Sequence, residues 1–104
     1  MIKINYYVGC NDKDTLKQKL SDDYFMMTFN TLFDNFTVTE ATGKFVNEEG
    51  LATTEKTFII TLLLNDDDKE TLEEWIEINC FYLKHELNQE SILVTKEVIQ
   101  ANFY

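Results

Sequence analysis

The residues of this 104-residue chain that are best suited to chemistry are polar and lie far apart in the sequence. A phenol, a carboxylate and an amide can hold and polarise a small ligand, or act as acid-base and orienting groups. A lysine among them would supply a positive charge that selects an anion. The side chain of Tyr7 could stack on a ligand, and its hydroxyl could donate a hydrogen bond. We predict a ligand-binding site made of six residues, which are Tyr7, Asn11, Glu55, Lys56, Gln89 and Ser91.

Motifs of the common catalytic machineries are missing from the sequence. The one histidine, His85, and the two separated cysteines, Cys10 and Cys80, do not make a zinc site. Three scattered glycines do not form a phosphate loop, and the run Asn65–Asp68 lacks the spacing of a calcium loop. We therefore expect no metal, no cofactor and no dedicated catalytic residue, and we interpret both cysteines as free thiols.

The charge balance restricts the partners. The chain has 19 acidic residues against nine basic ones, all of them lysine, for a net charge of −10. Such a chain repels polyanions and lacks the arginine that recognises phosphate in two contacts, so we expect no binding to double-stranded nucleic acid. A basic protein or a small anionic ligand fits better. No apolar run reaches the roughly 18 residues of a membrane span, and no signal peptide is evident, so we expect a cytoplasmic protein without membrane contact.

Hydrophobic periodicity predicts a single domain over residues 1–104 with six elements. Alternation predicts strands over residues 2–8, 36–46, 52–64 and 91–103. Helical spacing predicts helices over 15–34 and 69–87. The first helix can be continuous or can restart at Ser21, which has the chemistry of an N-cap. A turn is expected at 47–50, where Gly50 follows three polar residues.

The order of these elements is strand, helix, strand, strand, helix, strand. It predicts an α+β, ferredoxin-like βαββαβ fold, in which a four-stranded antiparallel sheet carries both helices on one face. The expected spatial order of the strands is fourth, first, third, second. The end of the first strand, the hairpin and the end of the second helix then meet at one edge, and this edge gathers the six candidate residues.

The other face of this sheet is left uncovered by the helices. If Phe58 and its alternate neighbours face the helices, other apolar residues point away from them. These are Ile59, Leu63, Leu93 and Ile99. Because a large exposed apolar patch usually marks an interface, we predict a homodimer formed through the open faces of two sheets. The alternative is a local patch covered by the C-terminus of the chain itself.

Three motifs occur in order along the chain. They are Tyr7-Val8-Gly9, the run Phe36-Thr37-Val38-Thr39-Glu40-Ala41-Thr42-Gly43, and Gln89-Glu90-Ser91-Ile92-Leu93. In these motifs the chain resembles a family of small bacterial and phage domains of unknown function, with Asn35 and Phe45 in place of the family's usual glycine and tryptophan. The resemblance implies the same fold and a bacterial or phage origin, and it implies no activity.

These observations favour a non-catalytic binding protein. It would be an inhibitor or signal-sequestering protein of a phage that acts against bacterial defence by binding a small anionic ligand or a basic host protein. The alternative is a small dimeric ferredoxin-like enzyme with an acid-base site at the polar sheet edge, built from Tyr7, Glu55 and Gln89. A structural or regulatory subunit without a site is a third interpretation.

Overall fold

The computed structural model of the protein describes residues 1–46 and 48–104. It contains four strands and two α-helices in the predicted order. The elements are β1 (Ile2–Gly9), α1 (Asp22–Leu32), β2 (Thr37–Val46), β3 (Ala52–Leu64), a short 3-10 helix (Asp66–Asp68), α2 (Lys69–Leu87) and β4 (Leu93–Val98). The strands form one antiparallel sheet in the order β2-β3-β1-β4. This arrangement confirms the predicted ferredoxin-like fold and its strand order.

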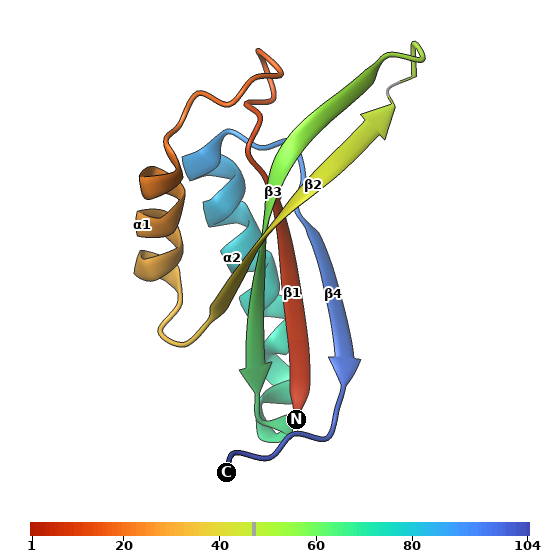
Figure 1. The fold of residues 1–104 in the computed structure, drawn as a ribbon. Coiled ribbons are helices and arrows are strands. Elements are labelled where there is room, and N and C mark those ends of the chain that lie inside the picture. The colour runs from red at the N-terminus through yellow and green to blue at the C-terminus, as the bar shows by residue number, and fades with distance from the viewer. Residues whose placement is uncertain (47) are drawn as a thin grey trace.

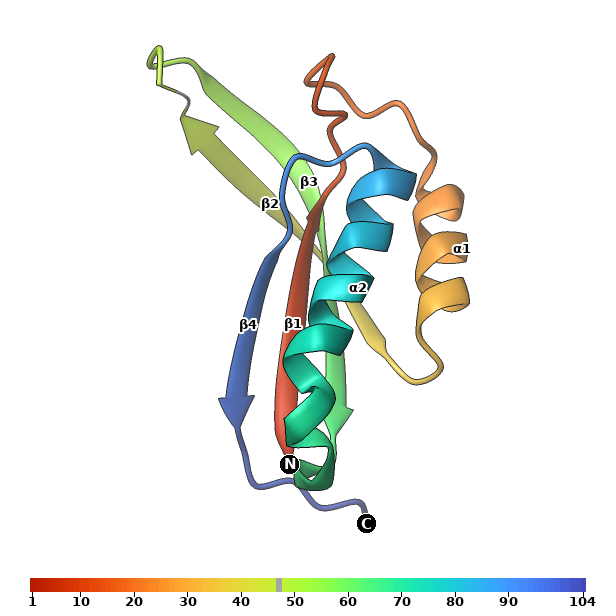
Figure 2. The same ribbon diagram turned by 180° about the vertical axis from the view of Figure 1, so that it is seen from behind.

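Both helices lie on one face of the sheet, as Figures 1 and 2 show from opposite sides. The reason is the alternation in β1, where Ile2, Ile4, Tyr6 and Val8 are buried and the residues between them are half-buried. Aromatic rings close the core: Phe58 of β3 lies 5.7 Å from the ring of Phe25 in α1, measured between centroids. The predicted helix-facing side of the sheet is thereby confirmed.

One polar pair lies inside this core. The amide of Asn79 in α2 donates to the hydroxyl of Tyr6 over 3.2 Å, and both residues are buried. Burial raises the pKa of the Tyr6 phenol to about 12, so the hydroxyl stays protonated. The pair fixes the position of α2 over β1 without titrating in the physiological range.

The first helix is shorter than the continuous helix over 15–34, and it matches the alternative with a restart at Ser21. The Ser21 hydroxyl accepts a hydrogen bond from the backbone N–H of Tyr24 at 3.2 Å, which satisfies an N–H at the helix start. Upstream of it the chain forms a loop, in which Leu16 adopts a φ of 59° and is 57% exposed. A leucine at helical spacing therefore lies outside the helix, because its left-handed backbone conformation interrupts a right-handed helix, and the N–H of Asp12 donates to the carbonyl of Lys17 across the loop at 2.8 Å.

The hairpin of β2 and β3 extends beyond the rest of the sheet. Residues 57–64 of β3 pair with β1, and residues 52–56 pair with β2 past the end of β1. The result is a projecting two-stranded arm, visible in Figure 1. The turn predicted at 47–50 includes Asn47, which is outside the described residues, and Gly50 has a φ of 82° that favours glycine.

The last strand is shorter than predicted. β4 ends at Val98, and the backbone from Ile99 onward is not a strand. The N–H of Ile99 donates to the carbonyl of Met1 at 2.9 Å, which holds the two ends of the chain together. Among residues 1–46 and 48–104, no helix is both long and apolar enough to cross a membrane.

Candidate functional site

A hollow in the open face of the sheet lies at the base of the projecting arm. The cross-strand register causes it: Thr57 of β3 pairs with Gly9 of β1 on one side and Ala41 of β2 on the other, and Glu55 pairs with Gly43. Since side chains of paired residues share a face of the sheet, three small residues leave space beside Thr57 and Glu55. The cavity has a volume of about 550 Å³, which is within the range of small-molecule sites.

Five of the six predicted ligand-binding residues line this cavity. They are Tyr7, Asn11, Glu55, Gln89 and Ser91. They come from the end of β1, the start of β3 and the connection from α2 to β4. These residues are up to 84 positions apart (from 7 to 91), and the fold brings them to one edge of the sheet.

The carboxylate of Glu55 is held in one position. Its Oε2 atom accepts a hydrogen bond of 2.9 Å from the backbone N–H of Asn11. A Cβ atom at Gly9 would lie 2.4 Å from Oε1 and 2.7 Å from Oε2, so the carboxylate occupies the space that a side chain at position 9 would take. Gly9 is therefore needed here for close approach, and a negative charge is fixed at the wall of the cavity.

The end of α2 positions Gln89. Asn88 adopts the left-handed conformation with a φ of 49°, and the N–H of Gln89 donates to the carbonyl of Lys84 at 3.0 Å, which is the bond pattern of a Schellman helix end. The amide nitrogen of Gln89 donates to the carbonyls of Asn11 and Leu87 at 2.9 and 3.2 Å. These two bonds fix the buried amide and tie it to the loop after β1.

That loop is tied to α2 by a second set of bonds. The amide of Asn88 donates to the carboxylates of Asp12 and Asp14 at 2.7 and 3.0 Å, and the N–H of Lys13 donates to the Asn88 carbonyl at 3.1 Å. The hydrogen bond from Asn88 lowers the pKa of Asp12. Asn11, which fixes Glu55, thus belongs to an anchored loop.

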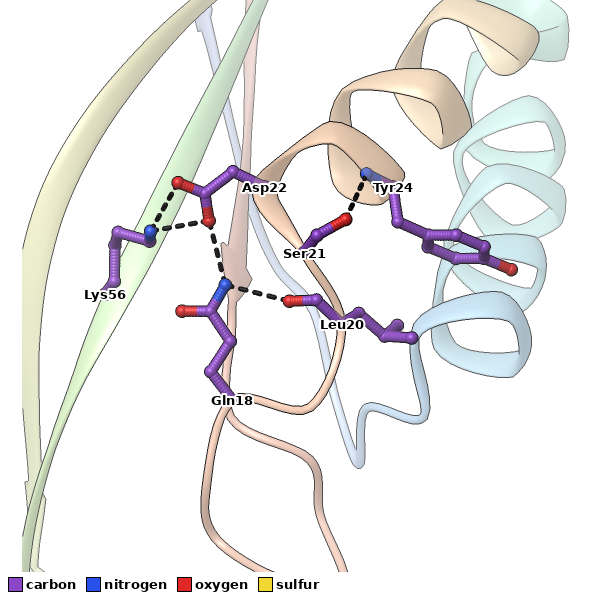
Figure 3. Close-up of polar contacts among 6 residues, drawn as sticks. All are labelled: Gln18, Leu20, Ser21, Asp22, Tyr24 and Lys56. Carbon is purple, nitrogen blue, oxygen red and sulfur yellow. Dashed lines mark hydrogen bonds and ion pairs between the residues drawn. The ribbon is translucent and has the colours of Figure 1, made fainter.

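Lys56 does not line this cavity, which corrects the prediction that it belongs to the ligand-binding site. Its amino group lies 2.6 and 2.7 Å from the two carboxylate oxygens of Asp22 at the start of α1, as Figure 3 shows. Gln18 donates to the same carboxylate at 2.8 Å. The pKa of Lys56 is raised and that of Asp22 is lowered by their contact. The cause is strand alternation, because adjacent residues Glu55 and Lys56 point to opposite faces of β3.

Without Lys56 the cavity is negatively charged. Three carboxylates line it, from Asp12, Glu55 and Glu90, together with the ammonium of Lys13. Its apolar wall includes Tyr7, Ile59 and Leu93. This combination suits a ligand with an aromatic or aliphatic part and a positive charge better than a small anion.

Sequence reasoning missed Thr57, which lines the cavity. Thr57 is only 8% exposed, and its Oγ1 is buried without a hydrogen-bond partner among the described residues. Its position two residues after Glu55 was a usable signal, because residues i and i+2 of a strand share a face. The small residues on either side of it became visible only with the cross-strand register.

Among the described residues, neither the buried thiol of Cys10 nor a group of metal-binding side chains forms a second site. The Cys10 thiol is buried, which raises its pKa to about 12, so it is a poor nucleophile. Within the described part of the chain, no three or more His, Cys, Asp and Glu side chains are grouped so that they could hold a metal ion.

The residue range 4–103 matches the family described as "Protein of unknown function (DUF3574)". The chain belongs to this family. The match confirms the resemblance seen in the sequence, and like that resemblance it carries no activity. No curated protein matches the chain.

Two solved structures share the fold over nearly the whole chain. A phage SAM lyase in complex with S-methyl-5'-thioadenosine is 18% identical, with a TM-score of 0.68, covering 92% of this chain and 79% of that one. A phage SAM lyase in the apo state is also 18% identical, with a TM-score of 0.64, covering 99% of this chain and 91% of that one.

These comparisons correct the interpretation of the chain as a non-catalytic binding protein. The two solved structures described above are those of an enzyme, so a binding protein without catalysis is no longer the favoured interpretation. The alternative, a small ferredoxin-like enzyme with its site at the polar sheet edge, agrees better with them.

Three of the four predicted dimer residues lie on the open face of the sheet, and the fourth, Ile99, follows the end of β4. Ile59 is half-buried and Leu93 is 61% exposed, and both line the cavity. Leu63 is 39% exposed, and Ile99 is half-buried next to Met1. The homodimer stays a prediction.

Proposed function

We propose that this protein is an enzyme that binds S-adenosylmethionine, or a closely related sulfonium nucleoside, in the cavity on the open face and releases S-methyl-5'-thioadenosine. The observation that carries the proposal is the carboxylate of Glu55, fixed over Gly9 at the wall of a cavity of about 550 Å³. The fold shared with the phage SAM lyase supports this choice of substrate.

Charge supports the same substrate class. S-adenosylmethionine carries a sulfonium, an ammonium and one carboxylate, so its net charge is positive. The cavity is lined by three carboxylates and one lysine, and the chain as a whole has a net charge of −10. Such a field raises the local concentration of a cationic substrate and speeds its association at low salt. A nucleoside phosphate would meet repulsion instead.

The apolar side of the cavity suits the nucleoside. Tyr7 presents a half-buried ring on β1, beside Ile59 of β3 and Leu93 of β4, with which it is paired across the sheet. A purine gains contact area against an aromatic ring and two aliphatic side chains. In this arrangement the base packs against Tyr7, and the cationic chain of the substrate extends toward Glu55.

The proposed reaction breaks the bond between sulfur and the aminobutyryl chain. The bonding electrons stay on sulfur, which becomes neutral. The carbon that sulfur leaves loses a bonding pair, which is replaced in one of two ways. Either the neighbouring carbon releases a proton to a base and a double bond forms, or the carboxylate of the same chain attacks the carbon that sulfur leaves. Neither way consumes water. Because the sulfonium loses its charge in the transition state, an apolar surrounding of the sulfur favours the transition state over the bound substrate.

The test is direct. Purified protein is incubated with S-adenosylmethionine, and S-methyl-5'-thioadenosine is measured by liquid chromatography. We expect release in the wild type and a loss of about 100-fold in Glu55→Gln, since a misplaced or missing polar contact costs about this factor. Glu40→Gln is the matched control, because Glu40 is exposed on β2 and does not line the cavity.

Two outcomes contradict the proposal. One is that the wild type neither releases S-methyl-5'-thioadenosine nor is stabilised against thermal unfolding by the substrate. The other is that Glu55→Gln and Glu40→Gln have equal activity. Proton magnetic resonance of the four-carbon product distinguishes proton loss, which leaves a double bond, from ring closure by the substrate's own carboxylate.

A homodimer through the open faces remains part of the proposal. Leu63 and Leu93 are exposed on the face that holds the cavity, so a second copy seated there would cover both the patch and the site opening. The cytoplasmic location expected from the sequence also stays a prediction.

A further inference from the structure

The hydroxyl of Thr57 is unusual among the threonines of the sheet. It is buried, it has no partner among the described residues, and it belongs to a residue that lines the cavity. Thr61, four residues further along the same face of β3, donates its hydroxyl to the Asn5 side chain at 2.7 Å. Buried polar groups are nearly always hydrogen-bonded, because an unmade bond costs free energy. The free hydroxyl of Thr57 therefore points to a ligand.

The surroundings of Thr57 explain why no protein group satisfies it. Its two cross-strand neighbours, Gly9 and Ala41, carry no polar side-chain atom. A valine has the same shape as threonine and would fill the same space. The hydroxyl thus has no role in the fold that the structure shows, and the residue that carries it lines the cavity next to Glu55, whose carboxylate lies over Gly9.

The other polar groups nearby define the chemistry of the ligand. Glu55 lies two residues before Thr57 on the same face of β3, about 7 Å along the strand. Gln89 uses its amide nitrogen in bonds to two carbonyls, so its remaining polar atom is the acceptor Oε1. A carboxylate, an amide oxygen and a hydroxyl oxygen together form a set of acceptors. A group that only donates hydrogen bonds and is positively charged fits this set, and an ammonium is such a group.

We infer that Thr57 is a specificity-determining residue that binds the ammonium group of the substrate together with Glu55 and Gln89. The inference rests on the proposed function. It adds which end of the substrate lies at the floor of the cavity, namely the end that carries the ammonium. It separates two related molecules: S-adenosylmethionine carries the ammonium, and S-methyl-5'-thioadenosine lacks it.

Isothermal titration of these two compounds tests the inference in the wild type, Thr57→Val and Thr57→Ser. We expect Thr57→Val to weaken S-adenosylmethionine about tenfold, as for the loss of one hydrogen bond to a charged group. Affinity for S-methyl-5'-thioadenosine stays unchanged, and Thr57→Ser, which keeps the hydroxyl, restores binding. Thr39→Val, exposed on the same face of β2, is the control and binds both compounds like the wild type.

Thermal unfolding without ligand adds a second measurement. A binding role and a purely structural role of the hydroxyl predict opposite changes in the melting temperature of Thr57→Val. Thr57→Val removes an unsatisfied buried hydroxyl, so we expect its melting temperature to rise. A lower melting temperature with unchanged affinities would overturn the inference.

The titrations separate this inference from the proposed function. If the wild type binds neither compound, the proposed function fails and the inference fails with it. If the wild type binds S-adenosylmethionine and Thr57→Val binds it equally well, only the inference fails. An equal loss for both compounds in Thr57→Val would place Thr57 at the nucleoside and overturn its assignment to the ammonium.

Discussion

Gly9→Ala is the substitution that most directly tests how the site is built. The new Cβ would lie 2.4 Å from Oε1 of Glu55, whereas ordinary contact begins at 3.4 Å, so the carboxylate must move by 1.0 Å. A displacement of about 1 Å takes Oε2 out of hydrogen-bond range of the Asn11 N–H, now 2.9 Å away. Gly9 does not have a positive φ, so the backbone accepts alanine without strain.

The expected magnitudes follow from these contacts. The hydrogen bond to the charged carboxylate contributes about 1.5–3 kcal/mol to the free energy of unfolding. Gly→Ala by itself stabilises a protein by about 0.4–1 kcal/mol, because alanine lowers the conformational entropy of the unfolded chain. We therefore expect a net loss of about 0.5–2.6 kcal/mol in the free energy of unfolding, measured by urea denaturation. A catalytic or binding group displaced by about 1 Å costs on the order of 100-fold in kcat/KM, measured as release of S-methyl-5'-thioadenosine.

A double-mutant cycle with Glu55→Ala decides whether the two residues act as one unit. If Gly9 matters only because it makes room for the carboxylate, adding Gly9→Ala to Glu55→Ala removes no further activity. Additive losses in the double variant would refute this reasoning. So would a Gly9→Ala variant that keeps the kcat/KM of the wild type.

Three further predictions concern residues outside the cavity's polar wall. Lys56→Met should lower the melting temperature and leave activity per folded molecule unchanged; an activity loss would return Lys56 to the site. The pKa of Asp22 is lowered in the folded protein, so its ion pair with Lys56 stabilises the fold at pH values above the usual pKa of an aspartate. This stabilisation is lost as the pH falls through the lowered pKa. The difference in melting temperature between Lys56→Met and the wild type should therefore vanish in acid. Leu63→Lys should convert a dimer to monomers in light scattering, and a wild-type mass of 12.3 kDa at micromolar concentration would refute the dimer. Asn79→Leu should cost about 1–3 kcal/mol in urea denaturation by leaving the buried Tyr6 hydroxyl unpaired, and an unchanged midpoint would contradict the role of that pair.

Much of the fold is determined by the sequence alone. The alternation from Ile2 to Val8 identifies β1 and its buried face, and the order of elements with right-handed crossovers leaves few sheet topologies. The gathering of Tyr7, Glu55 and Gln89 at one edge follows from strand directions, which the order of elements fixes. These features are local or topological, so they do not depend on the details of packing.

The errors in the sequence interpretation have separate physical causes. Helical spacing at Leu16 was a poor guide, because Leu16 adopts the left-handed conformation, which a continuous right-handed helix does not contain. Lys56 was placed beside Glu55 by proximity in the sequence, although the alternation of a strand already puts neighbours on opposite faces. The ion pair of Lys56 with Asp22, across 34 positions, was not readable from either residue alone.

Only the tertiary structure decided the shape of the site. A hollow exists because Gly9 and Ala41 fall opposite Thr57, and this register depends on how three strands pair. The same register leaves the Thr57 hydroxyl buried without a partner among the described residues and gives the Glu55 carboxylate its place over Gly9. A strand pattern specifies which face a side chain is on, but the residue opposite it is set by the paired strands together.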